Sequence, residues 1–377
     1  MKEKLRYFFR QETVLCIAFI LAICSMFFVP PSMEYITYVD FRTLAILFCL
    51  MITMAELRRT GIFQWVAQSF LGKVRKSWQL IWLLILLCFF SSMAVTNDVA
   101  LITFVPFTFI VLDLMGAEAK KKLLVPVVVL QTIAANLGSM LTPVGNPQNL
   151  YLYGRAGLSL GDFILLMLPY ALLSLLLLLI WGSLRSKTYP APIQVIFREK
   201  VCLSQKKAPL IVCTLLFLLN LLTVARIIPC WLTLILSILL FILTDRSVFA
   251  LVDYSLLLTF VGFFIFVGNI GRIPAFYGLL QKIVTGNELI AGVAASQVMS
   301  NVPAALLLSG FTTDLPPLIV GVNIGGLGTL IASMASLISY KFVVREESDT
   351  KGVYFRSFTV TNLCFLALLL LFSMIYA

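Results

Sequence analysis

Apolar runs long enough to cross a membrane recur along the whole chain, with short polar stretches between them. Windows of about 20 apolar residues are typical of transmembrane helices. We predict nine full spans: 12–29, 42–57, 123–157, 161–183, 208–225, 229–244, 254–270, 315–340 and 356–376. The spans 123–157 and 315–340 are each interrupted by polar or helix-breaking residues. Because the runs are continuous rather than alternating, the spanning elements are predicted to be helices.

Two further segments, 78–112 and 287–313, each place a polar centre between two apolar arms. The arms of the second segment have about 12 residues and reach about 18 Å as helices, short of a hydrocarbon core of about 30 Å. This favours a re-entrant hairpin. The first segment has longer arms, which fit either a re-entrant or a fully crossing hairpin. The amphipathic pieces 60–74 and 273–284 are predicted to lie along the membrane interface.

The composition agrees with an all-α polytopic membrane protein. Of 377 residues, 61% are apolar and 12% are charged, whereas soluble domains have about 45–50% and about 25%. The net charge of +11 is expected from basic cytoplasmic loops and not from binding to nucleic acid. The first residues resemble a signal peptide, but no small-x-small cleavage site follows, so a retained first helix is predicted.

The distribution of basic residues predicts the orientation of the chain. With the N-terminus in the cytoplasm and both hairpins returning to their side of entry, nine spans leave the C-terminus outside. Only five of the 28 Lys and Arg residues then lie outside: Arg42, Arg155, Arg226, Arg272 and Lys282. This asymmetry favours a multi-pass protein of the cell (inner) membrane in that orientation.

Cysteine and histidine usage excludes several chemistries. The eight Cys residues are scattered through apolar runs without metal-ligand spacing, so they are interpreted as small core residues. The chain has no His, which removes HExxH zinc sites, Ser-His-Asp catalysis and imidazole proton relays.

The chain contains an internal repeat. Three stretches of the first half align with three of the second: "VDFRTLAILFCLMITMAE" (39–56) with "VDYSLLLTFVGFFIFVGN" (252–269), "VTNDVALI" (95–102) with "MSNVPAAL" (299–306), and "ANLGSMLT" (135–142) with "VNIGGLGT" (322–329). Span, interfacial piece, hairpin, broken span and final span therefore occur twice, and the charge count gives the copies opposite orientations. We predict inverted repeats at 1–184 and 208–377, joined by a cytoplasmic linker, 185–207. Such repeats with broken helices are typical of secondary transporters.

The hairpin tips carry the polar groups that could hold an ion. Thr96, Asn97 and Asp98 stand at the first tip, and Ser300 and Asn301 at the second. Hydroxyl and amide oxygens suit Na⁺, and the helix N-termini after each tip offer N–H groups to an anion. The simpler alternative is hydrogen bonding between helices, but recurrence at both tips favours an ion site.

The first broken span, "QTIAANLGSMLTPVGNPQNLYLYG" (131–154), combines helix breakers with amides that are costly in lipid. An unwound segment that faces a cavity accounts for both. The partner span, 321–340, has Gly325, Gly326 and Gly328, which fit either close backbone approach to a ligand or packing between helices.

Asp98 is the acidic residue placed well within a hydrophobic segment, and its aligned counterpart is Val302. A carboxylate there is a functional hypothesis by default: a cation ligand, a proton carrier or a partner of a buried Arg. Glu56 lies near the end of its span beside Arg58 and Arg59 and is interpreted as part of a surface pair.

Together these motifs resemble the ion transporter superfamily, which includes divalent anion:sodium symporters, citrate carriers, arsenite permeases and D-type sodium/proton antiporters. The resemblance covers nearly the whole chain. It implies a transport domain that moves elevator-fashion against a scaffold, usually in a homodimer, with Na⁺ as a coupling ion and no other cofactor. The implied substrate-binding residues are Asn97, Asp98, Asn146, Pro147, Asn149, Asn301 and Thr329. The implied cation-binding residues are Thr96, Asn97, Asn136, Gly138, Ser300, Asn301, Asn323 and Gly325.

Several departures from the superfamily pattern bear on the substrate. Asp98 stands where symporters of di- and tricarboxylates have Thr, and this Asn-Asp pair is more similar to arsenite permeases. Val302 replaces a Thr at the second tip, and 331–336 lacks the Pro-Pro-Asn of the second break. The span 208–225 has no counterpart in the first copy.

The expected function is secondary transport of a small carboxylate or oxyanion, driven by Na⁺ or H⁺. The alternatives on the same fold are an arsenite or metalloid efflux permease and a Na⁺/H⁺ antiporter in which Asp98 carries the proton. A channel is a third class, and an enzyme fits least because no nucleophile–base pair is visible. The sequence does not identify the substrate.

Overall fold

The computed structural model describes residues 12–189, 203 and 207–376, and these residues form helices and connecting loops without any strand. The helices of the first half are α2 (Thr13–Met26), α3 (Tyr35–Tyr38), α4 (Phe41–Arg59), α5 (Ile62–Leu71), α6 (Ser77–Val95), α7 (Asn97–Met115), α8 (Ala117–Ser139), α9 (Pro147–Ala156) and α10 (Leu160–Ser186). Those of the second half are α11 (Lys207–Val224), α12 (Cys230–Thr244), η2 (Arg246–Leu251), α13 (Tyr254–Gly271), α14 (Pro274–Val284), α15 (Glu288–Met299), α16 (Asn301–Leu308), η3 (Ser309–Phe311), α17 (Leu315–Ile324), α18 (Met334–Glu346), η4 (Ser348–Thr350) and α19 (Lys351–Tyr376).

The predicted interruptions fall between helices. The span 123–157 is divided where α8 ends and α9 begins with Pro147, which has no N–H to donate. The span 315–340 is divided between α17 and α18. Most of the predicted linker 185–207 and all of 1–11 lie outside the described residues, and the repeat boundaries stay a prediction.

The protein is a polytopic membrane protein. Seven helical segments of the described chain are long and apolar enough to cross a membrane: those of α6, α7, α8, α10, α11, α13 and α19. The predicted span at α4 falls outside this set, and it carries four charged residues along 19 positions. Helices α2, α12, α15, α16 with η3, and α17 are apolar but shorter. Nine full spans, and the re-entry of either hairpin, stay predictions.

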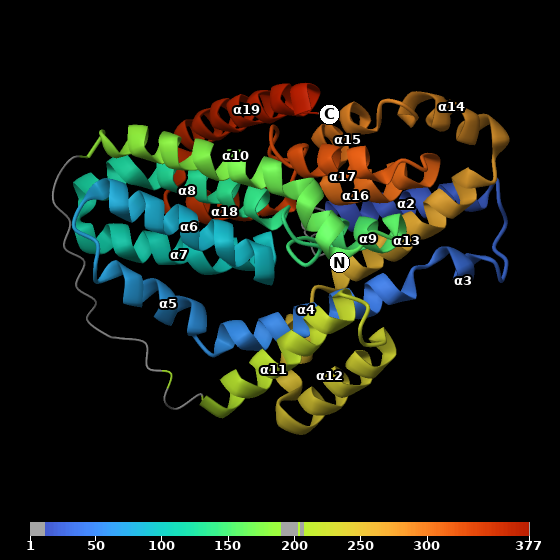
Figure 1. The fold of residues 1–377 in the computed structure, drawn as a ribbon, viewed down its shortest axis with the longest axis horizontal. Helices are drawn as coiled ribbons and strands as arrows, with labels where there is room; N and C mark the ends of the chain where they lie inside the picture. The colour runs from blue at the N-terminus through green and yellow to red at the C-terminus, as the bar shows by residue number, and fades with distance from the viewer. Residues whose placement is uncertain (1–11, 190–202, 204–206, 377) are drawn as a thin grey trace, which may run out of the picture.

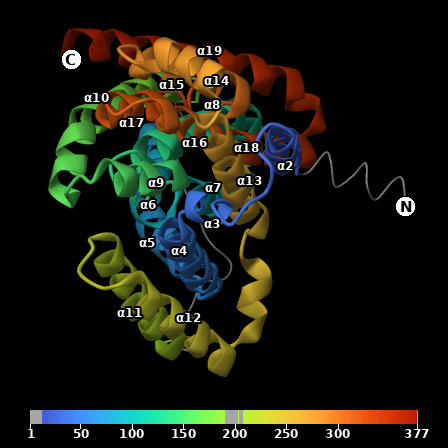
Figure 2. The same ribbon diagram turned by 90° about the vertical axis from the view of Figure 1, so that its right-hand side faces the viewer.

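The core is built around α8. Helices α6, α7, α8 and α10 run side by side along the long axis of the molecule (Figure 1), and 89% of the most apolar window of α8 is buried. Helix α19 packs across α8 and α10, while α15, α16 and α17 form a second group beside them. Helices α11 and α12 pack on α4 below the other helices (Figure 2).

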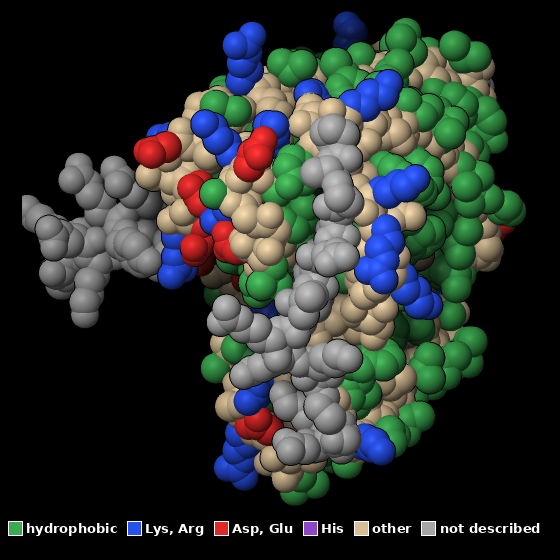
Figure 3. All heavy atoms as spheres, turned by 90° about the vertical axis from the view of Figure 1, so that its left-hand side faces the viewer, with side chains coloured by type: hydrophobic (Ala, Val, Ile, Leu, Met, Phe, Trp, Pro, Cys, Tyr) green, Lys and Arg blue, Asp and Glu red, His purple; other side chains and the backbone are tan. Residues whose placement is uncertain are grey.

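Charged side chains gather at one end of the molecule. The end where α6 and α8 begin and α7 and α10 end carries many Lys and Arg side chains and a group of acidic ones, with hydrophobic side chains along the flanks (Figure 3). Lys120 pairs here with Asp113 at 2.8 Å and with Glu347 at 2.7 Å. The loops at this end are those that the charge count assigns to the cytoplasm.

Two glycines permit equivalent close contacts in the two halves. A Cβ atom at Gly138 of α8 would lie 2.1 Å from the Phe89 carbonyl oxygen and 2.6 Å from Ser92 Oγ of α6. One at Gly325, which ends α17, would lie 2.9 Å from Ser296 Oγ of α15. In both places a helix of a predicted hairpin packs directly on the end of a broken helix.

The contact at Gly138 predicts a selective effect on stability. Gly138→Ala should lower the free energy of unfolding by about 1–3 kcal/mol, because the backbone of α6 must move to admit the methyl group. Gly72→Ala is the matched control, since a Cβ atom there meets nothing within 4 Å. Thermal melting of the purified variants in detergent measures both, and equal melting temperatures would contradict the close packing.

Candidate functional site

The two hairpin tips share an unusual backbone conformation. Thr96 links α6 to α7 with φ 75° and ψ 150°, and Ser300 links α15 to α16 with φ 75° and ψ 154°. Only Gly adopts this region without strain, and other residues there cost about 1–3 kcal/mol and cluster at functional sites. The chain therefore holds a hydroxyl residue at each tip against a conformational preference.

Each tip is attached to an interrupted helix by its backbone. The N–H of Asn97 donates to the Gly145 carbonyl at 3.1 Å, and the N–H of Asn301 donates to the Ala332 carbonyl at 3.0 Å. At the first tip, Asn97 Nδ2 also donates to Asn136 Oδ1 at 3.1 Å. The sequence predicted tips beside breaks, and these contacts join them directly.

The two interrupted helices cross through buried amides. Asn136 of α8 accepts a hydrogen bond from Ser333 Oγ at 2.9 Å and donates one to Ser336 Oγ at 3.3 Å. Ser333 and Ser336 lie at the start of α18, after the second break. The last turn of α8 is thereby tied to the second half of the chain.

The converse contacts are made by Asn323 of α17. It accepts from Asn146 Nδ2 at 3.2 Å and donates to Asn149 Oδ1 at 2.6 Å. The same spacing along the chain separates Asn136 from Asn323, Asn146 from Ser333, and Asn149 from Ser336. Each broken helix therefore offers one Asn before its break to two polar residues just after the break of the other.

The carbonyl groups left free by the breaks have side-chain partners. Asn149 Nδ2 lies 3.4, 3.2 and 3.2 Å from the carbonyl oxygens of Ser139, Met140 and Thr142 at the end of α8. Gln297 Nε2 donates to the Gly325 and Leu327 carbonyls after α17, at 2.8 and 2.9 Å. Such partners are required because unpaired backbone groups away from water are costly.

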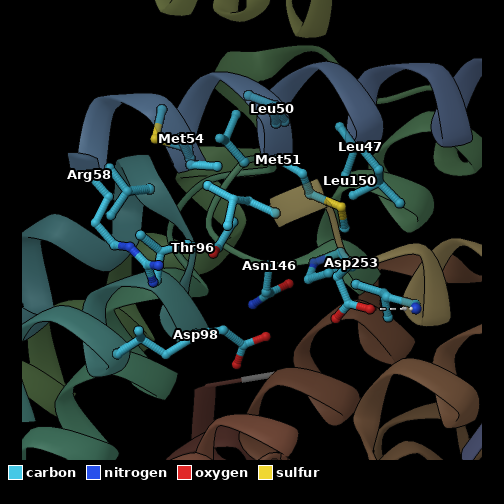
Figure 4. Close-up of a pocket in the computed structure, with 18 residues that line it drawn as sticks. Leu47, Leu50, Met51, Met54, Arg58, Thr96, Asp98, Asn146, Leu150 and Asp253 are labelled. Carbon is cyan, nitrogen blue, oxygen red and sulfur yellow. Dashed lines mark hydrogen bonds between the residues drawn. The ribbon is translucent and has the colours of Figure 1, made fainter. Parts of the chain in front are cut away.

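A cavity of about 190 Å³ opens beside the first tip. Its walls come from α4, the tip, the start of α9 and the segment before α13. It is lined by Leu47, Leu50, Met51, Met54, Ala55, Arg58, Val95, Thr96, Asp98, Val99, Ile102, Val144, Asn146, Pro147, Leu150, Leu251, Asp253 and Leu256. Figure 4 shows Arg58 pointing toward Thr96, with Asp98 below Asn146 and Asp253 on the other side.

The two carboxylates of the cavity differ in their bonding. Asp253 accepts the N–H of Leu256 at 2.9 Å and so caps α13. Asp98 Oδ1 is buried without a hydrogen-bond partner in the described structure. An ionised oxygen in this setting needs a proton or a bound cation, so Asp98 is the group with unused binding capacity.

A second cavity, of about 530 Å³, lies toward the other ends of α4 and α9. Arg42 on the first turn of α4 and Arg155 on the last turn of α9 line it, together with Tyr38, Asp40 and Tyr151. The first cavity meets α9 at its beginning and the second meets α9 at its end.

The structure brings most of the sequence-predicted site residues together. Thr96, Asp98, Asn146 and Pro147 line the first cavity, while Asn97, Asn136, Asn149, Ser300, Asn301 and Asn323 are buried around the crossing. Gly138 and Gly325 lie at the close helix contacts described above. Thr329 is exposed, and its hydroxyl donates to the Gln297 carbonyl at 3.1 Å rather than facing either cavity.

Other residues of the site escaped sequence reasoning. Arg58 was read as part of a surface pair, and Met51, Met54, Asp253 and Gln297 were not singled out. The alignment of 39–56 with 252–269 was the available signal. It pairs Asp40 with Asp253, and the structure shows both as caps, since Asp40 accepts the N–H of Thr43 at 3.0 Å.

The fold and the site define an all-helical, multi-pass membrane protein in which two interrupted helices cross at a buried polar centre. The chain belongs to the citrate transporter family, CitMHS, because the sequence model of that family matches residues 9–315. The ion transporter resemblance drawn from the motifs is thereby confirmed at the level of the family.

Several relatives match over most of their length. An uncharacterized transporter of Methanocaldococcus jannaschii is 34% identical over 313 residues, which cover 82% of this chain and 83% of the relative. The inner membrane protein YbiR of Escherichia coli is 30% identical over 322 residues, covering 84% and 83%. An uncharacterized transporter of Mycobacterium tuberculosis is 25% identical over 376 residues, covering 90% and 86%.

The strained backbone at Thr96 predicts that Gly and Ala variants differ in stability in the opposite order from that found within a helix. Thr96→Gly should be more stable than Thr96→Ala by about 1–2 kcal/mol, because only Gly relaxes at this backbone conformation. At a helical position such as Val99 the order should reverse, with Ala above Gly. Thermal melting of the four variants in detergent provides the comparison, and Ala above Gly at both positions would contradict strain at Thr96.

Proposed function

We propose that this protein is a secondary active transporter that moves a small carboxylate or oxyanion across the membrane, coupled to H⁺ or Na⁺. The observation that carries the proposal is the crossing of two interrupted helices at a buried polar centre, with cavities toward both ends of α9. Transporters form their substrate sites in this way, at the interface of repeats near the middle of the membrane.

Anion binding is supported by the helix ends at the first cavity. Helix α7 begins at Asn97 and α9 begins at Pro147, both beside the cavity. Their first turns place the positive end of the helix dipole beside the cavity, which favours an anion. Arg58 adds a full positive charge to the same wall.

Coupling to a cation is supported by Asp98. Asp98 lines the cavity that would hold the anion, and its buried Oδ1 has no hydrogen-bond partner in the described structure. A proton or a Na⁺ ion bound there reduces the repulsion between carboxylate and anion, so the two would bind together. The hydroxyl and amide oxygens of Thr96 and Asn97 are suitable further ligands for Na⁺.

The proposed movement of the substrate from one side of the membrane to the other depends on the predicted repeats. The equivalent tip conformations and the reciprocal Asn contacts support two inverted repeats with re-entrant hairpins. The elevator movement is proposed from the resemblance to the ion transporter superfamily. The homodimer and the cytoplasmic N-terminus stay predictions.

A metalloid efflux permease or a Na⁺/H⁺ antiporter is the second candidate. The observation in its favour is that two carboxylates, Asp98 and Asp253, face one cavity with a single Arg. Such a lining suits a cation or an uncharged hydroxide better than a multivalent anion.

Reconstitution into liposomes tests the proposal. Labelled citrate and labelled arsenite are offered separately under an imposed H⁺ or Na⁺ gradient. Asp98→Asn should abolish gradient-driven uptake, because the Asn side chain carries neither a proton nor the negative charge that holds Na⁺. Asp253→Asn is the matched control and should keep most of the activity, since Asn caps a helix as well as Asp does.

The outcomes separate the candidates. Citrate uptake that responds to a gradient supports the anion transporter, and arsenite movement with no citrate uptake supports the second candidate. Full gradient-driven activity in Asp98→Asn, with unchanged melting temperature, would remove Asp98 from the coupling mechanism.

A further inference from the structure

We propose that the second cavity is an anion-collecting site formed by Arg42 and Arg155, and that the transported anion enters the protein from this end. The inference rests on the proposed anion transport and adds a binding site and a direction to it. The anion would pass from this site to the polar centre and leave through the cavity that contains Asp98.

The shape of the cavity suits a small multivalent anion. Its volume of about 530 Å³ exceeds that of the first cavity, and Arg42 and Arg155 reach it from two different helices. Guanidinium groups bind carboxylates and oxyanions through paired N–H donors. The Tyr151 hydroxyl lies within reach of Arg155 and hydrogen-bonds with Ser309 Oγ at 2.9 Å, which adds a polar group to the wall.

Neither guanidinium group, that of Arg42 or that of Arg155, is paired with a carboxylate in the described part of the chain. Asp40 lines the same cavity, but its carboxylate accepts both the N–H of Thr43 at 3.0 Å and the Thr43 hydroxyl at 2.5 Å. It is committed to capping α4, so the positive charges remain available to a ligand.

The two cavities differ in charge. The second has two arginines and the capping carboxylate of Asp40. The first has Arg58 with the capping carboxylate of Asp253 and the unpartnered carboxylate of Asp98. By the alignment, Arg42 corresponds to Ser255, so the first cavity has no equivalent of it. A cleft lined with positive charge raises the local concentration of anions, whereas the unpartnered carboxylate of Asp98 in the first cavity opposes their return.

The predicted topology gives this difference a direction. Arg42 and Arg155 are among the five basic residues that the charge count places outside, and the first cavity meets α4 at its cytoplasmic end. Anions are therefore collected outside and released inside, which makes the protein an uptake system.

Transport from each side tests the site. Labelled citrate is offered to intact bacterial cells that express the protein, where it reaches the outer face, and to everted membrane vesicles, where it reaches the inner face. In cells, Arg42→Gln and Arg155→Gln should each raise KM about tenfold, the loss expected for one charge-assisted contact. In everted vesicles KM should stay within about twofold of the unmodified protein.

Matched variants distinguish a binding site from general effects of charge and folding. Lys282→Gln removes one exposed positive charge at the same predicted end but outside the cavity, and it should leave KM unchanged. Arg42→Lys and Arg155→Lys keep the charge and should recover part of the affinity. Melting temperatures of all variants identify any that fail to fold.

Each result decides between defined alternatives. If KM in cells is unchanged for folded Arg42→Gln and Arg155→Gln, the proposed binding site is overturned. If Lys282→Gln raises KM as much as these two variants do, the effect is one of general surface charge and the binding site is likewise overturned. Citrate transport into everted vesicles alone overturns the direction. If the unmodified protein transports no anion from either side under any gradient, the proposed function itself fails.

Discussion

The need to pair every polar backbone group away from water is the constraint on which this structure depends. A helix that stops in the middle of a hydrophobic protein leaves free carbonyl and N–H groups, and each costs several kcal/mol in hydrocarbon. Asn149 and Gln297 meet that need by binding the carbonyls at the ends of α8 and α17. These side chains therefore stabilise the interruptions.

Buried amides also hold the two halves of the chain together. Asn136 and Asn323 reach across to the residues after the opposite break, so each broken helix is stabilised in part by residues of the other. The tips add backbone bonds to the breaks, through the N–H groups of Asn97 and Asn301. Unwound backbone, strained tips and cavities therefore form one mutually dependent unit in the middle of the protein.

Much of this could be predicted from the sequence. Runs of apolar residues locate the helices to within a few residues, and Pro147 and the nearby Gly145 locate the first break. The internal alignment predicted that Asn136 and Asn323 are equivalent, because equivalent residues occupy equivalent places in a repeat. The crossing contacts could not be predicted, since they join residues far apart in the chain.

The residues that line the first cavity also could not all be predicted from the sequence. Arg58 lies between Glu56 and Arg59 in the sequence, with Leu57 before it, and Arg59 does form the expected pair with Glu56 at 3.2 Å. Arg58 instead points toward Thr96. The pattern of charges along the sequence does not indicate the direction in which a side chain points. Thr329 was predicted from its place in a motif, but the loop after α17 carries it to the surface.

The side chains that make the helix crossing are Asn and Ser, and none of them carries a charge or exchanges a proton in the physiological range. Hydrogen bonds between neutral groups are little affected by ionic strength, which screens charges. The cohesion of the centre should therefore be nearly the same in acidic, alkaline, dilute or salty surroundings. A membrane protein exposed to different solutions on its two faces thus keeps one internal framework, while its response to those solutions depends on its charged residues, among them those that line the cavities.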